Sequence, residues 1–384
     1  MFIEIRKAGF VNKGAELMLK AIIEKIGLRY SDSKLVMEPN RISAPFDKRA
    51  KLGLYQKILP GRYATLPIIN SFPNFIPSSF RRMYGLVIEN EIKVVFDASG
   101  FSYSDQLGIS PTQHLAQLSK KWKKQGTKII LLPQAFGPFS SPKIKDAVKI
   151  IADNADLIFA REATSYSHLT DVVGKRENIK IAPDFTNLVE GVVPNYIDKE
   201  NHGFCIVPNY RMIEKTSKEE SKSYLPFLTS CLRYLLEKNA KPFILVHETE
   251  HDREIAEYLK TSVGTEIPII EEEDPLKIKG ILGICDATIG SRFHGLVSAL
   301  SQGVPSIGTG WSHKYQMLFQ EYSFEEGLID ILGEEKIYRN ILEKLTTETT
   351  RQDIAQKLKI KSEQLKDASE QMWHNIFTLI DKFN

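Results

Sequence analysis

The residues best suited to chemistry follow a short apolar run late in the chain. Residues 287–290 (ATIG) have the composition of a buried strand, and Ser291, Arg292, Phe293 and His294 come directly after it. Ser291 is a candidate cap for a helix that begins near Phe293, and the first turn of such a helix points its unpaired N–H groups at an anion. Arg292 adds a guanidinium that grips carboxylate or phosphate, and His294 adds an imidazole that exchanges a proton near neutral pH. We therefore expect an anion site with an acid–base group. The alternative is that Arg292 and His294 only cap the helix and bond nearby carbonyl groups.

Further basic residues end other predicted strands. His313 and Lys314 follow the run VPSIGTG. Because the carboxyl ends of parallel strands meet at one edge of a sheet, we expect both side chains on the same rim as the SRFHG segment. Arg161 follows the apolar run LIFA. It is either another anion-binding group or half of an ion pair with Glu162 or a neighbouring acid.

Two carboxylates occupy similar positions. Asp97 in VVFDASG and Asp184 in IAPDF each follow a predicted strand. A carboxylate there can stabilise developing positive charge or take the proton of a hydroxyl group. An aspartate after a strand is also typical of the N-cap of the next helix or turn, so both interpretations stay open.

The start of the chain and one histidine pair are further candidates. Asn12, Lys13 and Gly14 begin the first predicted helix, where they either bind a phosphate or acceptor group or only start the helix. His247 and His251 have the spacing of a zinc-binding H-E-x-x-H helix. The segment VHETEH lies where a strand passes into a loop, so we expect no zinc there and no metal elsewhere.

Two series of alternating strands and helices position these residues. Short apolar runs such as VVF, IILL and LIFA are typical of strands that are covered on both faces. A second series begins at GFCIVPN and ends at VPSIGTG. The pattern predicts an α/β fold of two Rossmann-like domains that face each other across a cleft, which is the expected active site.

The domain boundaries follow from changes in composition. We predict an N-terminal domain over residues 1–195 and a C-terminal domain over 196–350, joined by a stretch rich in turn formers. Five prolines interrupt residues 41–82, which predicts an irregular excursion from the first sheet. Residues 351–384 carry apolar residues at helical steps and predict a long amphipathic helix. We expect this helix to pack back on the N-terminal domain; the alternative is a coiled-coil partner.

The composition excludes several classes of protein. The chain has 51 basic and 48 acidic residues, a formal net charge of +3, which is too small a bias to indicate nucleic-acid binding. Cys205, Cys231 and Cys285 have no metal or disulfide spacing, so we expect buried thiols in a reducing compartment. The N-terminus has no signal-peptide pattern, and no uncharged apolar stretch approaches about 18 residues. We expect a cytoplasmic protein that does not span a membrane.

Several segments in series resemble the polysaccharide pyruvyl transferase family. They are NKGAEL, LPQAFGPF, AREATSY, APD, and SRFHGLVSALSQGVP followed by HK, and they run in order from Asn12 to about Phe319. The resemblance implies a fold like that of the GT-B-type glycosyltransferases, phosphoenolpyruvate as donor, a hexose or N-acetylhexosamine of a surface glycan as acceptor, and no cofactor. Two departures are the strand end FDASGF and Glu162 in place of the usual aspartate.

The resemblance also implies roles for individual residues. The family's Arg-x-His pair falls on Arg292 and His294, with Gly295 next to it. The arginine of the family's Val-Arg-Asp/Glu motif falls on Arg161, and the lysine after its last glycine-rich turn falls on Lys314. His294 is the candidate general acid that protonates the enol methylene and later the departing phosphate. Asp184 is the candidate catalytic carboxylate.

Other interpretations remain open. A nucleotide-sugar glycosyltransferase of the same shape is the nearest rival, although LVSALSQGVP lacks the glutamate that such enzymes often use to hold the donor ribose. A non-catalytic protein that binds a glycan or an anion is the other. Residues 41–82 hold eight basic residues, one acid and six aromatics, which suggests contact with an anionic inner leaflet that presents a lipid-linked acceptor. A lid over the acceptor or plain domain packing is the alternative.

Overall fold

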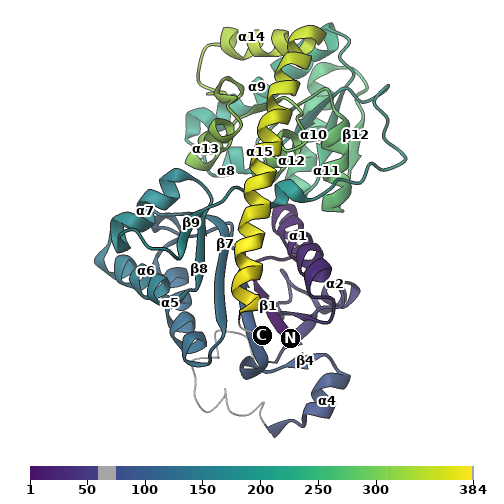
Figure 1. The fold of residues 1–384 in the computed structure, drawn as a ribbon. Helices are drawn as coiled ribbons and strands as arrows, with labels where there is room; N and C mark the ends of the chain where they lie inside the picture. The colour runs from purple at the N-terminus through teal and green to yellow at the C-terminus, as the bar shows by residue number, and fades with distance from the viewer. Residues whose placement is uncertain (59–74, 311, 383–384) are drawn as a thin grey trace. The chain divides into compact units, whose positions relative to one another are not determined.

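The computed structural model describes residues 1–58, 75–310 and 312–382, and the chain divides into two compact units. Unit 1 comprises Met1–Phe185 and Ala368–Asn384, and unit 2 comprises Thr186–Asp367 (Figure 1). Because each unit has its own sheet and core, the two are described separately. The predicted cleft between two domains stays a prediction.

The described part of unit 1 contains one parallel sheet in the order β4-β3-β2-β1-β5-β7-β8-β9, with β6 paired to β7. Its strands are β1 (Phe2–Arg6), β2 (Lys34–Met37), β3 (Tyr55–Lys57), β4 (Leu86–Val87), β5 (Ile92–Asp97), β6 (Phe101–Tyr103), β7 (Lys128–Phe136), β8 (Leu157–Ala160) and β9 (Ile179–Ile181). β1 and β5 pair in register from Ile3 with Val94 to Arg6 with Asp97. The near-continuous burial of β5, β7 and β8 fits strands covered on both faces.

Helices cover both faces of this sheet. They are α1 (Lys13–Arg29), α2 (Phe46–Lys51), α4 (Ser78–Met83), α5 (Ile109–Lys124), α6 (Pro142–Asn154) and α7 (Ala163–Val173). Val95 shares a core with Trp122 of α5, whereas the next residue, Phe96, meets Trp373 edge to face with ring centroids 6.1 Å apart. Successive strand residues point to opposite faces, so α5 and the helix that carries Trp373 lie on opposite sides of the sheet.

Residues 41–82 are more regular than predicted. The segment contains α2, strand β3 and most of α4. Strand β3 belongs to the sheet, since it pairs in parallel with both β2 and β4. The prediction of an irregular excursion from the sheet is therefore wrong for the described part, whereas residues 59–74 lie outside the described residues. The reason is that a three-residue strand is too short to show the alternation by which strands are recognised.

Unit 2 contains a five-stranded parallel sheet in the order β12-β11-β10-β13-β14. Its strands are β10 (Phe204–Val207), β11 (Pro242–Val246), β12 (Ile269–Glu271), β13 (Ala287–Gly290) and β14 (Ser306–Gly308). One face packs on α9 (Lys218–Glu237), α10 (Glu250–Val263) and α14 (Glu335–Thr346). The other packs on α11 (Pro275–Ile284) and α12 (Phe293–Leu300). Short helices α8 (Arg211–Glu214) and α13 (His313–Glu321) follow β10 and β14.

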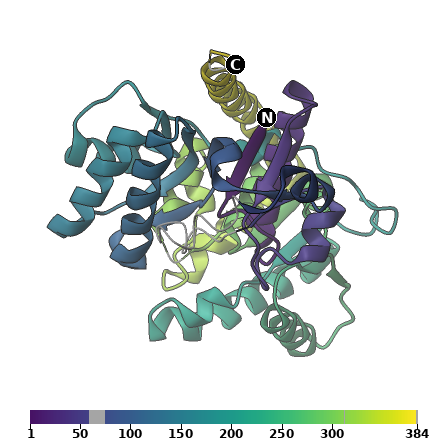
Figure 2. The same ribbon diagram turned by 90° about the horizontal axis from the view of Figure 1, so that it is seen from below.

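The last element is α15 (Glu348–Asp381), the long C-terminal helix that the sequence predicts. Its first part belongs to unit 2, where Leu358 packs with α12 and α13, and its last part, from Ala368, belongs to unit 1. There it lies beside α1, since Lys25 bonds Glu370 and Arg29 bonds Asp381 (Figures 1 and 2). One helix thus contributes to both cores.

The predicted fold class, an α/β fold with parallel sheets and a long C-terminal helix, is confirmed. All three cysteines are buried as expected. Among the described residues, no helix is both long and apolar enough to cross a membrane.

Candidate functional site

The order in which strands are added to the sheet of unit 2 reverses between β10 and β13. β10 comes first in the chain, β11 and β12 extend the sheet on one side of it, and β13 and β14 extend it on the other. In a parallel sheet, a ligand site forms outside the carboxyl ends of the strands at such a switch point. The segments that leave β10, β11 and β13 at this edge carry most of the residues discussed below.

The helix that was predicted near Phe293 is α12, and it begins there. Its N-cap residue is Arg292, whose side chain accepts no hydrogen bond from the first turn. Ser291 was predicted as the cap, and this is wrong, because its hydroxyl lies 3.0 Å from the Tyr224 hydroxyl. The first-turn N–H groups of α12 therefore have no side-chain cap, as an anion site requires.

Arg292 is 8% exposed and has two acidic partners. Its Nη1 pairs with the carboxylate of Glu248, and its Nη2 pairs with that of Asp252. Burial lowers the pKa of Arg292 to about 10, so the guanidinium stays positively charged at neutral pH. The guanidinium predicted to bind an anion is thus already in contact with two carboxylates.

A buried network fixes the backbone around Ser291. The Asn209 amide donates a 2.6 Å hydrogen bond to the Ser291 carbonyl, and the Tyr315 hydroxyl donates one of 2.9 Å to the same oxygen. The Asn209 N–H in turn donates to the Tyr224 hydroxyl at 3.0 Å. Burial raises the pKa of Tyr224 to about 12, which keeps this hydroxyl protonated. The strand end is therefore held from three other elements.

His294 and Lys314 both contact the Phe293 ring. The His294 ring meets the Phe293 ring edge to face at 5.4 Å between centroids. Lys314 Nζ lies 5.1 Å from the centroid of the same Phe293 ring. His313 is the first residue of α13, whose N-cap Ser312 also makes no side-chain cap hydrogen bond. The starts of α12 and α13 thus lie together, with a histidine at each.

Gly295 lies at van der Waals distance from residues of two neighbouring segments. A Cβ atom on Gly295 would lie 3.4 Å from Arg292 Cβ and 3.9 Å from His247 Nε2. His247 directly follows β11 and is 9% exposed. It therefore stands beside the first turn of α12.

In unit 1, the two main candidates contact each other. Arg161 Nη1 lies 3.5 Å from Asp184 Oδ2, with 5% and 6% of the side chains exposed. Glu162, the other suggested partner of Arg161, instead caps α7 by accepting from the Ser165 N–H at 3.0 Å. The residues follow the adjacent strands β8 and β9, so the carboxyl edge of this sheet brings them together.

Asp97 lies inside unit 1. It is 1% exposed, it accepts a 2.9 Å hydrogen bond from the Tyr103 hydroxyl, and its Oδ2 lies 3.8 Å from Arg6 Nε. Such contacts are those of a carboxylate that supports the fold. A part in substrate binding stays a prediction.

Asn12, Lys13 and Gly14 begin α1, as predicted. The Asn12 side chain accepts a 3.0 Å hydrogen bond from the Ala15 N–H, and Lys13 pairs with Glu16 at 3.2 Å. Gly14 is buried. These contacts fit a simple helix start, and binding by this segment stays a prediction.

The sequence interpretation missed Glu248 and Asp252. Both lie in or next to VHETEH, which was considered only as a zinc pattern. Among the described residues, no group of three His, Cys, Asp or Glu side chains is placed to hold a metal ion. The signal that was available is position, because an acid that directly follows β11 must lie at the edge next to the switch point.

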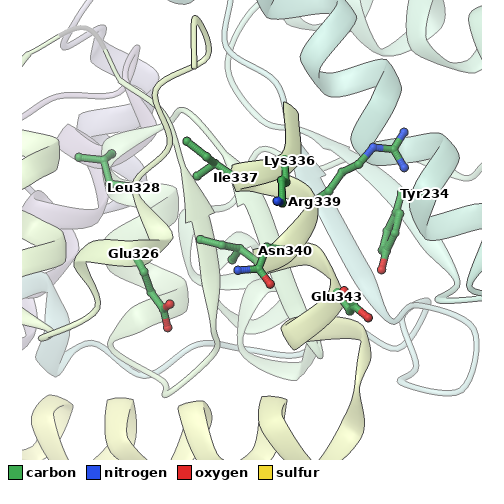
Figure 3. A pocket seen from close by; sticks show the side chains of 9 residues that line it. Tyr234, Glu326, Leu328, Lys336, Ile337, Arg339, Asn340 and Glu343 are labelled. Carbon is green, nitrogen blue, oxygen red and sulfur yellow. The ribbon is translucent and has the colours of Figure 1, made fainter. Parts of the chain in front are cut away.

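Unit 2 also has a surface pocket of about 920 Å³ between α9, α14 and the segment after α13 (Figure 3). Tyr234 lines it from the last turn of α9, which leads into β11, so the pocket lies toward the amino ends of the strands. Two of its charged residues have ion-pair partners that do not line the pocket: Arg339 pairs with Glu335, and Glu326 pairs with Lys344. No candidate residue lines it, and we place the site at the carboxyl edge instead.

Comparison with known proteins gives both a family and a fold. The model of the family described as polysaccharide pyruvyl transferase matches residues 12–313. Anabaena Alr3699/HepE in complex with UDP-glucose has a similar structure, with a TM-score of 0.61 and 13% identity over 98% of this chain and 99% of that chain. The S. aureus MnaA–UDP co-structure gives 0.57 and 12% over 94% and 93%. A UDP-N-acetylglucosamine 2-epimerase gives 0.59 and 10% over 99% and 96%. At these identities the structural likeness shows the fold alone.

Proposed function

Because the chain belongs to the polysaccharide pyruvyl transferase family, and is thus a transferase, we propose that its donor is phosphoenolpyruvate and its product a pyruvate ketal. The pyruvyl group moves onto a sugar of a surface polysaccharide or its precursor, and phosphate is released. The acceptor presents two hydroxyl groups that close the ketal.

The observation that carries this proposal is the pair of helix starts in unit 2. α12 and α13 follow neighbouring strands, and neither N-cap side chain accepts a hydrogen bond from its helix. Phosphoenolpyruvate carries two anionic groups, a carboxylate and a phosphate. Two helix N-termini with Lys314 and Arg292 beside them supply amide donors and positive charge for both.

The reaction has four balanced steps in this proposal. His294 gives a proton to the enol methylene, which becomes a methyl group and leaves positive character on C2. A sugar hydroxyl attacks C2 and loses its proton to the base, and the C2–O bond to phosphate breaks with its electron pair leaving on the phosphate, which takes a second proton from His294. A second hydroxyl attacks C2 to close the ring and also loses its proton to the base, so the two protons released match the two that His294 gives, and proton exchange with solvent resets both groups. Asp184 is the proposed carboxylate base, and its Oδ2 lies 3.5 Å from Arg161 Nη1.

A glycosyltransferase that uses a nucleotide sugar is the second candidate, because the fold also occurs in proteins solved with UDP or UDP-glucose. In such an enzyme a glutamate in the helix of the donor site often holds the ribose. Residues 296–305 (LVSALSQGVP), which contain most of α12, have no acid. This absence favours phosphoenolpyruvate.

One assay separates the candidates. The protein is incubated with phosphoenolpyruvate, or with UDP- or GDP-sugars, in the presence of an acceptor panel, and free phosphate and nucleotide diphosphate are measured. We expect phosphate release that requires both phosphoenolpyruvate and an acceptor. Release of a nucleoside diphosphate (UDP or GDP) from a sugar nucleotide, or no turnover with any donor, contradicts the proposal.

A further inference from the structure

The two carboxylates that contact Arg292 differ in where the chain places them. Asp252 lies in the first turn of α10 and is 1% exposed. Its Oδ1 accepts a 2.8 Å hydrogen bond from the Tyr210 N–H, while its Oδ2 pairs with Arg292. Its backbone N–H donates to the Thr249 hydroxyl at 3.2 Å. Asp252 therefore ties together the segments that follow β10, β11 and β13.

Glu248 is placed differently. It lies in the three-residue connection between β11, which ends at Val246, and α10, which begins at Glu250. Its carboxylate pairs with the Nη1 edge of Arg292. A glutamate side chain has one more rotatable bond than aspartate, and a residue outside a helix or strand has more freedom to change its rotamer. Glu248 can therefore leave Arg292 at a smaller cost than Asp252.

The charges around Arg292 make such a movement necessary for anion binding. One guanidinium faces two carboxylates, so the cluster has a formal charge of −1. A phosphate or carboxylate that binds Arg292 needs one edge of the fork and meets repulsion from any carboxylate that stays. If the incoming anion replaces one carboxylate, an edge of the guanidinium becomes available and the repulsion by that carboxylate is removed.

We propose that Glu248 is an internal competitor of the donor anion: it occupies the Nη1 edge of Arg292, and the donor takes its place while Asp252 keeps the Nη2 edge in position. This inference rests on the proposed function, which supplies the anionic donor. Glu248 then sets donor affinity, and Asp252 is a positioning residue. In this arrangement the acidic pair discriminates against weakly bound anions. Only a ligand with further contacts at α12 and α13 gains enough binding free energy to offset the cost of displacing Glu248 from Arg292.

The test compares two isosteric variants on the same guanidinium. Binding of phosphoenolpyruvate and of inorganic phosphate is measured by isothermal titration calorimetry for the wild type, Glu248→Gln and Asp252→Asn, with thermal unfolding as a check of the fold. We expect Glu248→Gln to bind both ligands about tenfold more tightly, because one negative charge is removed. Asp252→Asn should bind both about tenfold more weakly, because Arg292 loses its anchor. In turnover assays Glu248→Gln should lower the donor KM more than it changes kcat.

The outcomes distinguish this inference from the proposed function. Unchanged or weaker phosphate binding by Glu248→Gln overturns the role of Glu248, whatever the enzyme transfers. Glu248→Ala repeats the measurement should the amide variant fail to fold, and it should also tighten binding. A wild type that binds phosphate but neither binds nor turns over phosphoenolpyruvate overturns the proposed donor, while the phosphate titrations still decide the role of Glu248.

Discussion

Arg292 illustrates how the meaning of a residue depends on its partners. The sequence indicates a guanidinium at a helix start, and α12 does start at that point. It does not indicate that Glu248 and Asp252 lie against the same side chain, since both follow a different strand, β11, and precede Arg292 by at least 40 residues. The type and place of the group were predictable, whereas its electrostatic surroundings depend on tertiary contacts.

His294 carries the most direct prediction at this scale. If it is the general acid, His294→Ala should lower kcat by roughly two to four orders of magnitude, because proton delivery to the methylene loses its positioned donor. Donor binding, measured separately, should change much less. The measurement is acceptor-dependent phosphate release under saturating phosphoenolpyruvate. Near-normal turnover would remove His294 from this role.

The Arg161–Asp184 pair carries a prediction about stability. Both side chains are almost fully buried and 3.5 Å apart. Asp184→Asn should destabilise unit 1 by about 3 kcal/mol, because it removes the negative charge from a buried ion pair. Removing both charges in Arg161→Met/Asp184→Leu should cost less than the sum of the two single changes.

A double-mutant cycle checks this prediction by urea unfolding, followed by the fluorescence of Trp122 and Trp373 of unit 1. Additive costs for the two residues would show that the contact contributes little. Activity of the same variants tests the catalytic role separately, since Asp184→Asn should lose turnover even at temperatures where it is fully folded.

At the scale of elements, long and periodic segments were predictable and short ones were not. The C-terminal helix was predicted over 351–384 and is found at Glu348–Asp381, because its apolar residues recur over many turns. Strand β3, only Tyr55–Lys57, was missed. Its last residue, Lys57, is 1% exposed and pairs with Glu4 and Glu89 at 3.1 and 2.8 Å. A buried ionic network inside a sheet has no pattern in a single sequence.

The packing of α15 gives a prediction with a control on the same helix. Trp373 is 1% exposed and meets Phe96 and Phe185 edge to face at 6.1 and 6.0 Å. Trp373→Ala should therefore cost about 3–5 kcal/mol, through lost burial and the cavity it leaves. Ile360 is 58% exposed, so Ile360→Ala should change stability by less than about 0.5 kcal/mol. Differential scanning calorimetry of both variants gives the comparison, and similar costs for the two would contradict this packing.

For the whole molecule, alternation of strands and helices was enough to predict two α/β units, because the longer strands and helices of each unit had their own local signals. The order of the strands, and with it the switch point between β10 and β13, had to come from the structure. The boundary between the units differs in detail, since unit 2 begins at Thr186 and not at residue 196. The end of α15 belongs to unit 1, which contains the N-terminal part of the chain on which this helix was expected to pack.

Membrane contact is a prediction about the whole molecule's surface. Of the eight basic residues in 41–82, Arg62 lies outside the described residues, and three of the other seven are buried and engaged internally: Arg49, Lys57 and Arg81. The remaining charge predicts at most a weak, salt-sensitive association with anionic lipid, about 1 kcal/mol for each basic residue near the surface. Co-sedimentation with vesicles of neutral and of anionic lipid, at low and at high salt, measures it. Equal binding to both lipids would reject the membrane hypothesis in favour of a lid or plain packing.

The passage of α15 from one unit to the other makes the stability of unit 1 depend on the last residues of the chain. Met372, Trp373, Ile376 and Ile380 are each at most 2% exposed, and all follow the point at which the helix joins unit 1. A chain that ends at Asp367 loses these four side chains from the core of unit 1, while unit 2 keeps its own part of α15, including Leu358. We therefore expect a lower unfolding temperature for unit 1 and a nearly unchanged one for unit 2. Hydrogen exchange resolves the two units, with faster exchange expected in β1 and β5 but not in β10 and β13. Equal loss of protection in both sheets would mean that the units unfold as one.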